Sequence, residues 1–454
     1  MITSNTLSMG AALLMGASTV LAATTTCSID NKCPESAPCC SQYGECGIGA
    51  YCLGGCDPRM SFSLDSCAPA PQCESRSMPL TSTDTILDQT KYLGDPSKGD
   101  WVLSDGSQVL TNDEGILLTM PAESAGTVLA STVYMWYGNV RARMKTSRGA
   151  GVVSAFILLS DVKDEIDFEF IGVDLETAQT NFYFQALPVW TNTANITDIS
   201  DTYSNFHDYE IQWTPDTITW LVDGVAGRTL KKSDTWNATT NNWNYPQTPA
   251  RVQLSIWPGG ASSNAQGTID WAGGEIDWDS TDIQNYGYDF VTVSSVEIDC
   301  YNATTAPGTN NAVSYYYDGE AGTNNTVVNG KNATVLASFL ATGTDMDAGA
   351  SSASASAASS TAQTIPGNSE SGGVGSSGTV QGEGSSSSSS SGDDGSSSSS
   401  SSSDCDTDKT SFTQSCETST AKSGTSGTKG EAVVGGLGGS AFAAMVAVGV
   451  LAWL

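Results

Sequence analysis

Histidine and positive charge are the scarcest features of this sequence. Its 454 residues include one histidine, His207, and 18 lysine or arginine residues against 49 acidic ones, for a net charge of −31. One histidine argues against a histidine-rich metal centre, and a Ser-His-Asp triad would have to use it. The charge argues against nucleic acid or an anionic membrane surface as partner, because both repel an acidic chain. We expect no metal and no cofactor.

Long helical patterns are missing from the middle of the chain. Between residues 80 and 300 the sequence consists of short runs rich in Val, Ile, Thr, Tyr and Trp, such as 209–213, 217–222 and 251–257, separated by Gly, Asp, Asn and Pro. The dipeptide Asp223-Gly224 lies between two such runs and is typical of a β-hairpin. About 220 residues of this kind predict an all-β domain, an antiparallel β-sandwich or jelly roll.

Basic residues are also missing from the N-terminal leader, where Met9–Ala23 form an apolar stretch that ends in small residues. We interpret residues 1–23 as a signal peptide. A secreted chain makes its 12 cysteines disulfide partners rather than zinc ligands. Five Asn-x-Ser/Thr sequons agree with passage through the secretory pathway, at Asn195, Asn237, Asn302, Asn324 and Asn332.

The C-terminus carries the features of a glycosylphosphatidylinositol (GPI) signal. Residues 441–454 are apolar to the last residue, too short for a membrane span, and no basic flank follows them. A polar spacer precedes them, and before it lies the small-residue cluster Ser423–Gly427, within which we place the ω-site at Gly424. We therefore expect residues 426–454 to be removed, and the membrane to be reached only through the anchor.

Two further segments flank the expected β-domain. Nine cysteines fall between Cys27 and Cys73, so residues 24–73 predict a small module that depends on disulfides for its fold. Residues 301–425 predict a Ser/Thr-rich, glycosylated linker, disordered where serine dominates, for example in 385–391 and 396–403. Cys405 and Cys416 lie inside this stalk and can pair with each other.

The most informative stretch is 164–170, with the sequence DEIDFEF. Alternate side chains of a strand share a face, so Glu165, Asp167 and Glu169 are expected to point the same way. Neighbouring carboxylates disfavour each other's ionisation, which suits a site that needs one acid ionised and another protonated. Retaining glycoside cleavage has that need, with two carboxyls about 5–5.5 Å apart. The Cα atoms of Glu165 and Glu169 are about 13 Å apart on a strand, and side chains leaning inward approach that separation.

Two other interpretations of this stretch are a solvated edge strand and part of a calcium site. The apolar run 155–159 just before it, and Phe168 and Phe170 within it, favour instead a strand that is buried on one face. We therefore interpret the three acids as catalytic.

The DEIDFEF motif resembles the E-x-D-x-E signature of glycoside hydrolase family 16. Further stretches resemble the fungal Crh group of that family, the cell-wall chitin–glucan transglycosylases: 179–184 (QTNFYF), 206–215 (FHDYEIQWTP), 218–224 (ITWLVDG), 256–260 (IWPGG) and 267–274 (GTIDWAGG). The resemblance covers about residues 80–300 and implies a jelly-roll catalytic domain with a retaining mechanism.

This resemblance also implies roles for individual residues. Glu165 matches the nucleophile, Asp167 the assisting acid, and Glu169 the acid/base, which also contacts substrate. The sugar-contacting positions fall on Gln253, Trp257 and Thr268. Trp257 would stack on a pyranose face, while the other two would hydrogen-bond hydroxyl or acetamido groups.

The N-terminal module resembles the hevein-like, family 18 chitin-binding modules in residues 39–46 (CCSQYGEC) and 51–52. The resemblance implies that Ser41 bonds an acetamido group and that Tyr43 and Tyr51 stack on N-acetylglucosamine rings. Glu45 stands where that family usually has an aromatic residue. The module also has one cysteine more than the eight-cysteine framework, so Cys73 or Cys67 is available to bridge within the catalytic domain or to Cys300.

Together these features predict a GPI-anchored, extracellular transglycosylase of the cell wall. It would cleave a chitin donor and transfer the chain to a β-1,6- or β-1,3-glucan acceptor. The alternatives are a hydrolase of the endo-β-glucanase or chitinase type, and a non-catalytic chitin-binding wall protein. The intact set of three acids argues against the last.

Overall fold

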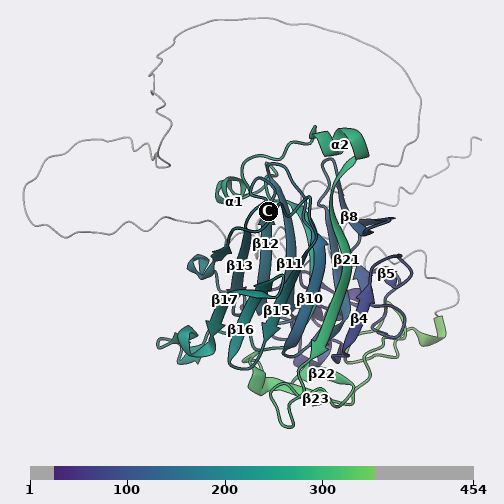
Figure 1. Ribbon diagram of the computed structural model, residues 1–454. Coiled ribbons are helices and arrows are strands. Elements are labelled where there is room, and N and C mark those ends of the chain that lie inside the picture. Colours follow the sequence, from purple (N-terminus) through teal and green to yellow (C-terminus); the bar gives the residue numbers. More distant parts are fainter. Residues whose placement is uncertain (1–24, 353–454) are drawn as a thin grey trace, which may run out of the picture. The chain divides into compact units, whose positions relative to one another are not determined.

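The computed structural model describes residues 25–352 (Figure 1). The expected signal peptide, the serine-rich part of the linker, Cys405, Cys416 and the GPI signal lie outside this range. Within it, no helix combines the length and apolar character that crossing a membrane requires.

The catalytic domain consists of two eight-stranded sheets. The first, here the β10 sheet, has the order β17-β16-β15-β10-β21-β8-β7, and β4 also pairs with β21. Its strands are β4 (Arg76–Pro79), β7 (Gln108–Asn112), β8 (Gly115–Pro121), β10 (Gly138–Lys145), β15 (His207–Trp213), β16 (Thr217–Val222), β17 (Val225–Lys231) and β21 (Tyr288–Cys300). Buried and more exposed residues alternate along β10 and β15, so this sheet has one core face and one solvent face.

The second sheet, here the β12 sheet, has the order β14-β13-β12-β11-β20-β9-β6-β5. Its strands are β5 (Ile86–Asp88), β6 (Trp101–Leu103), β9 (Thr127–Met135), β11 (Val152–Ser160), β12 (Glu165–Ile171), β13 (Ala178–Tyr183), β14 (Ala194–Ile196) and β20 (Ala250–Pro258). Every residue of β11 and β12 is buried, so this sheet is covered on both faces there. The prediction of an all-β sandwich is confirmed.

One hydrophobic core lies between the sheets and draws on both. Phe156 and Phe168 stack with ring centroids 6.1 Å apart, and Tyr209 of β15 meets Phe168 edge-to-face at 5.5 Å. The predicted hairpin turn at Asp223-Gly224 joins β16 to β17, with φ of 50° and 77° at its two residues. Short helices α1 (Gln266–Trp271) and α2 (Thr281–Tyr286) follow β20 and lie near one end of the strands, whereas β22 and β23 lie near the other (Figure 1). A further two-stranded ladder, β18 (Trp236–Asn237) and β19 (Asn242–Trp243), precedes β20.

The N-terminal module is held mainly by disulfides and turns. Its regular elements are β1 (Cys39–Cys40), β2 (Cys46–Gly47), the 3-10 helices η1 (Gly49–Cys52) and η2 (Leu64–Ser66), and β3 (Ala70–Pro71). Its four disulfides are Cys27–Cys40, Cys33–Cys46, Cys39–Cys52 and Cys56–Cys67. The fifth, Cys73–Cys300, ties the module to β21, which resolves the alternatives that the sequence left open.

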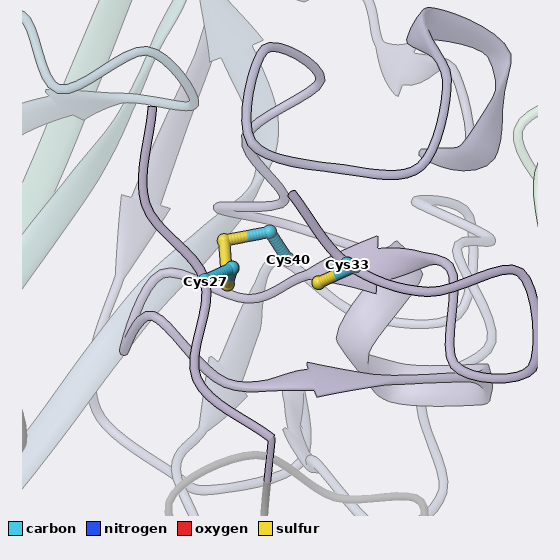
Figure 2. Close-up of side chains that lie close together, drawn as sticks. All are labelled: Cys27, Cys33 and Cys40. Atoms are coloured by element: carbon cyan, nitrogen blue, oxygen red, sulfur yellow. A yellow bond between two sulfur atoms is a disulfide. The ribbon is translucent and has the colours of Figure 1, made fainter. Parts of the chain in front are cut away.

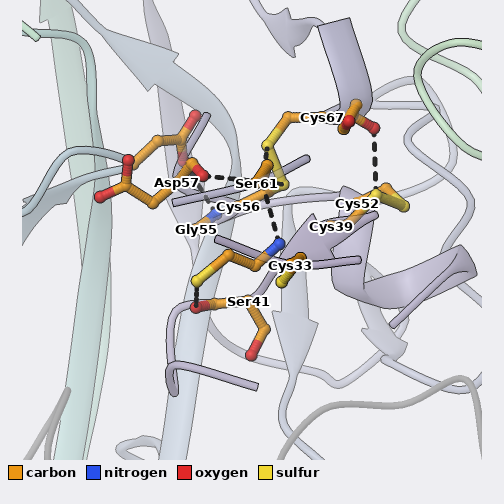
Figure 3. The surroundings of a disulfide bond; sticks show 12 residues. Cys33, Cys39, Ser41, Cys52, Gly55, Cys56, Asp57, Ser61 and Cys67 are labelled. Atoms are coloured by element: carbon orange, nitrogen blue, oxygen red, sulfur yellow. Dashed lines mark hydrogen bonds between the residues drawn. A yellow bond between two sulfur atoms is a disulfide. The ribbon is translucent and has the colours of Figure 1, made fainter. Parts of the chain in front are cut away.

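Three cysteines of the module lie close together, but all three are in disulfides and so are not metal ligands. The sulfur atoms of Cys27, Cys33 and Cys40 lie within 4.8 Å of one another because two disulfides are adjacent (Figure 2). Each of the three is oxidised, so none is a thiolate ligand. Beside the Cys56–Cys67 bridge, the Ser61 hydroxyl donates to the carbonyl of Asp57 at 2.7 Å and accepts from the Cys40 amide at 2.9 Å (Figure 3).

The folded body continues past the point where the sequence predicted a linker. Residues 301–352 include β22 (Ser314–Tyr317) and β23 (Val327–Gly330), and β22 pairs with β3 of the module. Tyr315 packs edge-to-face on Trp136 of the catalytic domain, with ring centroids 5.9 Å apart. The predicted start of the linker at residue 301 is therefore corrected. Aromatic and aliphatic residues of 301–352 are buried against the module and the catalytic domain, although the polar residues around them are typical of a linker.

A small hydrophobic cluster fastens the end of this extension. Leu336, 1% exposed, packs with Leu53 of the module and Tyr92 of the catalytic domain, whereas Leu340 is 48% exposed. Replacing a buried leucine with alanine removes contacts and leaves a cavity.

We predict that Leu336→Ala lowers the free energy of unfolding by about 2–5 kcal/mol, measured by chemical denaturation. Leu340→Ala is the matched control and should change it by less than about 0.5 kcal/mol. Equal effects of the two substitutions would show that the extension does not contribute to the folded core.

Candidate active site

Strand β12 separates its side chains into two sets. Ile166, Phe168 and Phe170 belong to the hydrophobic core between the sheets. Alternation therefore places Glu165, Asp167 and Glu169 on the opposite face of the β12 sheet. The predicted strand and the shared face of its acids are both present. This strand is buried on both faces, however, since the three acids are 3%, 1% and 4% exposed.

Cross-strand register defines three rows on this acidic face, each running across β13, β12, β11 and β20. The rows are Tyr183–Glu165–Leu159–Arg251, Asn181–Asp167–Ile157–Gln253 and Gln179–Glu169–Ala155–Ser255. Apolar side chains of β11 thus lie between the acids and the polar residues of β20. The rows bring the predicted acids and Gln253 onto one surface, with a band of low polarity between them.

The acids lack the partners that usually accompany buried charge. Among residues 25–352, no lysine or arginine forms an ion pair with any of them. Within the same residues, Oε2 of Glu169 is fully buried without a hydrogen-bond partner, and the fully buried oxygens of Asp167 face no donor other than the neighbouring Glu165 carboxyl. Native proteins leave few such groups unsatisfied, and those that persist are commonly functional.

Burial shifts all three carboxyls toward the protonated form, and the Asp167 charge adds to the shift of the two glutamates. Burial raises the pKa of Asp167 to about 7, although a hydrogen bond from the Glu165 carboxyl and the charge of Arg228 act in the opposite direction. Burial, and then the Asp167 charge, raise the pKa of Glu165, which the Lys163 ammonium partly offsets. Burial and Asp167 likewise raise the pKa of Glu169 well above its usual range. Because the three acids lie on one face of the same strand, the ionisation of one disfavours that of its neighbours.

Asp164, the first acid of the motif, is a structural residue that accepts hydrogen bonds from neighbouring loops. Its Oδ2 accepts hydrogen bonds from the amides of Gln247 and Thr248 at 2.9 and 3.1 Å and from the Thr248 hydroxyl at 2.7 Å. Its Oδ1 accepts from the Gln185 amide at 3.1 Å. Burial raises its pKa to about 6, and these bonds limit the rise. Asp164 thus fixes the turn before β12 to two other loops.

An aromatic pair borders the acidic face beyond Glu169. Trp257 of β20 lies in register with Val153, next to Ile171, and stacks on Trp271 of α1 with ring centroids 5.9 Å apart. Trp271 in turn donates from Nε1 to Oε1 of Gln179 at 2.9 Å. Trp257 therefore lies two residues along β20 from Ser255, which is in the row of Glu169, and Trp271 stacks on one of its faces.

Thr268 lies on α1 and is fully buried, and its hydroxyl has no hydrogen-bond partner within the described part of the chain. Of the three predicted sugar contacts, Gln253 is the one in register with an acid, since it shares a row with Asp167. The sugar-contacting roles of Gln253, Trp257 and Thr268 stay predictions.

Comparison with known proteins identifies the family. Residues 96–273 match the family model described as glycosyl hydrolases family 16. The chain is 67% identical over 324 residues to Crh-like protein 3 of Botryotinia fuckeliana, covering 71% of this chain and 72% of that protein. The chain belongs to the Crh-like family. It is also 52% identical over 327 residues to Crh-like protein 2 of Aspergillus fumigatus, covering 72% of this chain and 73% of that one.

Among solved structures, the apo Crh5 transglycosylase is similar at 28% identity with a TM-score of 0.48, covering 60% of this chain and 99% of that one. The predicted Crh group of family 16 is confirmed by the curated relatives, and with it an enzyme of the glycosidase and transglycosylase type.

In this Crh-like chain the predicted chitin contacts of the module differ in accessibility. Ser41 is 2% exposed, and its hydroxyl accepts the amides of Tyr43 and Glu45, both at 3.3 Å. Tyr51 is 4% exposed among the disulfides, and burial followed by the Glu45 charge raises its pKa. Tyr43 is half-buried. Direct chitin contact by Ser41 and Tyr51 would need the packing around them to open, so these roles stay predictions.

The sequons also differ in accessibility. Asn195, Asn302 and Asn332 are exposed, which suits glycosylation, whereas Asn237 and Asn324 are half-buried. His207 lies on β15 of the other sheet, held between Asp223 and Ser200 at 2.7 and 2.9 Å, and takes no part in the acidic face.

The sequence interpretation missed several polar residues next to the acids. Arg251 and Ser255 share a face with Gln253 and Trp257, because the four alternate along β20. That alternation is visible in the run 251–257 and could have identified both residues. Lys163 and Gln42 carried no such signal, since only the tertiary fold brings the module to the turn before β12.

The raised carboxyl pKa values predict a stability that falls as pH rises. Asp167 has an ordinary pKa of 3.8 and one of about 7 in the folded protein, so the native state binds the extra proton between these values. The contribution of Asp167 to stability is therefore greatest below its ordinary pKa and is lost as pH rises through 7. We predict that Asp167→Asn raises the melting temperature at pH 8 and that the gain shrinks toward pH 4.

The matched control is Asp105→Asn, because Asp105 is exposed in the loop before β7. It should leave the dependence of melting temperature on pH unchanged. A variant of Asp167 that melts at a lower temperature than the native chain at pH 8 would contradict the assignment of a penalised buried charge.

Proposed function

We propose that this protein is a retaining transglycosylase that cleaves chitin and transfers the released chain to a β-1,3- or β-1,6-glucan. The observation that supports it most directly is the row of three buried carboxyls on β12, without an ion-pair partner among residues 25–352. A fold gains nothing from such a cluster, whereas acid/base and nucleophilic catalysis on a glycoside needs it. Membership of the Crh-like family supports the same chemistry.

In the first step Glu169 acts as general acid. Its raised pKa favours the protonated form, which can give its proton to the glycosidic oxygen of the leaving chain. The carboxylate of Glu165 attacks the anomeric carbon, the bond to the leaving oxygen breaks, and a glycosyl ester forms. Glu165 attacks in its ionised form, and its hydrogen bond to Asp167 gives its proton a route to that neighbour before attack.

In the second step Glu169, now ionised, takes the proton of an incoming hydroxyl. The oxygen of that hydroxyl attacks the anomeric carbon, and Glu165 is released as a carboxylate. A glucan hydroxyl gives the cross-linked product and water gives hydrolysis. The apolar side chains of Leu159, Ile157 and Ala155 beside the acids favour transfer, because they leave water few partners there.

The proposal places this reaction at the cell surface. The signal peptide directs the chain to the secretory pathway, the GPI signal anchors it to the plasma membrane, and the serine-rich linker carries the enzyme into the wall. The five disulfides of the described residues agree with an oxidising compartment. Chitin and glucan are neutral polysaccharides, which do not repel a chain of net charge −31.

The test is a donor–acceptor assay with a chito-oligosaccharide donor and a labelled laminari-oligosaccharide acceptor. We predict labelled hybrid products from the native protein and none from Glu165→Gln. Glu169→Gln should slow transfer from an unactivated donor by about 10²–10⁴-fold but should still react with an aryl glycoside whose leaving group needs no proton.

Added azide separates the two roles. With Glu165→Ala it should give a glycosyl azide of inverted configuration, and with Glu169→Ala one of retained configuration, because the azide replaces a different partner in each case. Glu210→Gln, on the other sheet, is the matched control and should retain activity. Only free reducing ends would make the protein a hydrolase, and no product would favour a non-catalytic wall protein.

A further inference from the structure

The N-terminal module contacts the catalytic domain at the turn that leads into β12. The Lys163 ammonium, 4% exposed, donates to the backbone carbonyl of Gln42 at 2.8 Å. The Gly55 amide donates to Asp161 Oδ1 at 2.8 Å, and Arg59 donates to the carbonyl of Val162 at 2.8 Å. Three consecutive residues of the turn, 161–163, are thus fixed by the module, and Glu165 is two residues beyond Lys163.

One side chain of the module reaches the acidic face itself. The Gln42 side-chain oxygen Oε1 accepts a hydrogen bond from Arg251 at 2.8 Å and a longer one from Nε2 of Gln253 at 3.4 Å. Arg251 shares a row with Glu165, and Gln253 shares one with Asp167. Because a guanidinium only donates, this contact fixes which end of the Gln42 amide is oxygen.

The close approach depends on two glycines. A Cβ on Gly54 would lie 2.3 Å from the Arg251 guanidinium, and one on Gly55 would lie 2.6 Å from Cβ of Gln42. Gly55 also has φ of 85°, which other residues rarely adopt. The position of Gln42 is therefore fixed by the surrounding backbone as well as by its hydrogen bonds.

This arrangement leaves one donor and one acceptor without a partner. Within the described residues, neither Nε2 of Gln42 nor Oε1 of Gln253 takes part in a hydrogen bond, although the two residues are 7% and 2% exposed. Neither atom is among the fully buried ones, so both retain access. One N–H donor of the module and one carbonyl acceptor of the catalytic domain thus belong to two side chains that contact each other.

We propose that Gln42 is a specificity-determining residue of the active site, which together with Gln253 recognises the acetamido group of the donor sugar. A secondary amide carries one C=O and one N–H, which complement the free N–H of Gln42 and the free oxygen of Gln253. The Cα atoms of Asp167 and Gln253 are two strand spacings apart, about 10 Å, a gap that one pyranose ring and its substituent can span. This inference rests on the proposed function.

The test compares N-acetylchitotetraose with cellotetraose, which carries hydroxyl groups in place of the acetamido groups. Gln42→Glu keeps the acceptor for Arg251 but removes the free donor. We expect it to raise the KM for N-acetylchitotetraose about tenfold, the effect of one lost hydrogen bond, with kcat within about twofold and no change for cellotetraose. Gln42→Met, which adds no charge, should show the same loss of preference.

Gln72→Glu is the matched control, since Gln72 bonds Asn329 and the amide of Ala312 rather than the acidic face. It should leave both KM values unchanged. Melting temperatures of all variants separate a structural effect, which would lower activity on both sugars, from a loss of recognition. An equal loss on both tetrasaccharides, or none on either, would overturn the role of Gln42 and identify a hydroxyl contact or a purely structural one.

Binding of N-acetylchitotetraose to Glu169→Gln, measured by calorimetry, distinguishes this inference from the proposed function. If the native protein catalyses transfer and the Gln42 variants have no effect, the inference alone is wrong. If Gln42→Glu weakens binding about tenfold but the native protein catalyses no transfer, the proposed function alone is wrong. Neither binding nor transfer overturns both.

Discussion

The placement of three carboxyls on one buried strand face, with no ion-pair partner among residues 25–352, is the constraint on which the site depends. Burial is the main cause that disfavours their ionised forms, and the Asp167 charge adds to the effect on the two glutamates. The sheet must hold them there against this penalty. It does so through β12, whose alternate residues Ile166, Phe168 and Phe170 are buried in the hydrophobic core between the sheets.

Hydrogen bonds to Asp164 and to the backbone of β12 fix the position of these acids without pairing their carboxylates with a cation of the described residues. Asp164, adjacent to Glu165, uses its carboxylate to tie the turn to Gln247, Thr248 and Gln185, so the strand begins at a fixed point. Trp220 of the opposite sheet donates its indole N–H to the backbone carbonyl of Asp167 at 3.0 Å, which anchors the middle of the strand without touching its carboxylate. Arg228 acts on Asp167 only through its charge.

Much of this could be predicted from local pattern, because strands and their faces depend on period-two alternation. The acids of 165–169, the hairpin at Asp223-Gly224 and the sandwich class follow from such patterns. The folded extension 301–352 could not be predicted in this way. Its few buried residues, such as Tyr315 and Leu336, are spread between polar segments, and their burial depends on contacts with distant parts of the chain. The contact of Gln42 with Arg251 spans 209 residues, and no local rule of the sequence reports it.

That contact changes how the N-terminal module relates to catalysis. A binding module on a flexible linker raises the local concentration of substrate but leaves the active site unaltered. Here the module is fixed to β21 by Cys73–Cys300, to the extension by β3 and β22, and to the turn before Glu165 by Lys163. Its residues Gln42, Gly54 and Gly55 pack on Arg251, on the same face as the nucleophile candidate. In this chain, the proposed recognition of substrate by Gln42 and the position of the turn before Glu165 therefore depend on the same set of contacts between the module and the catalytic domain.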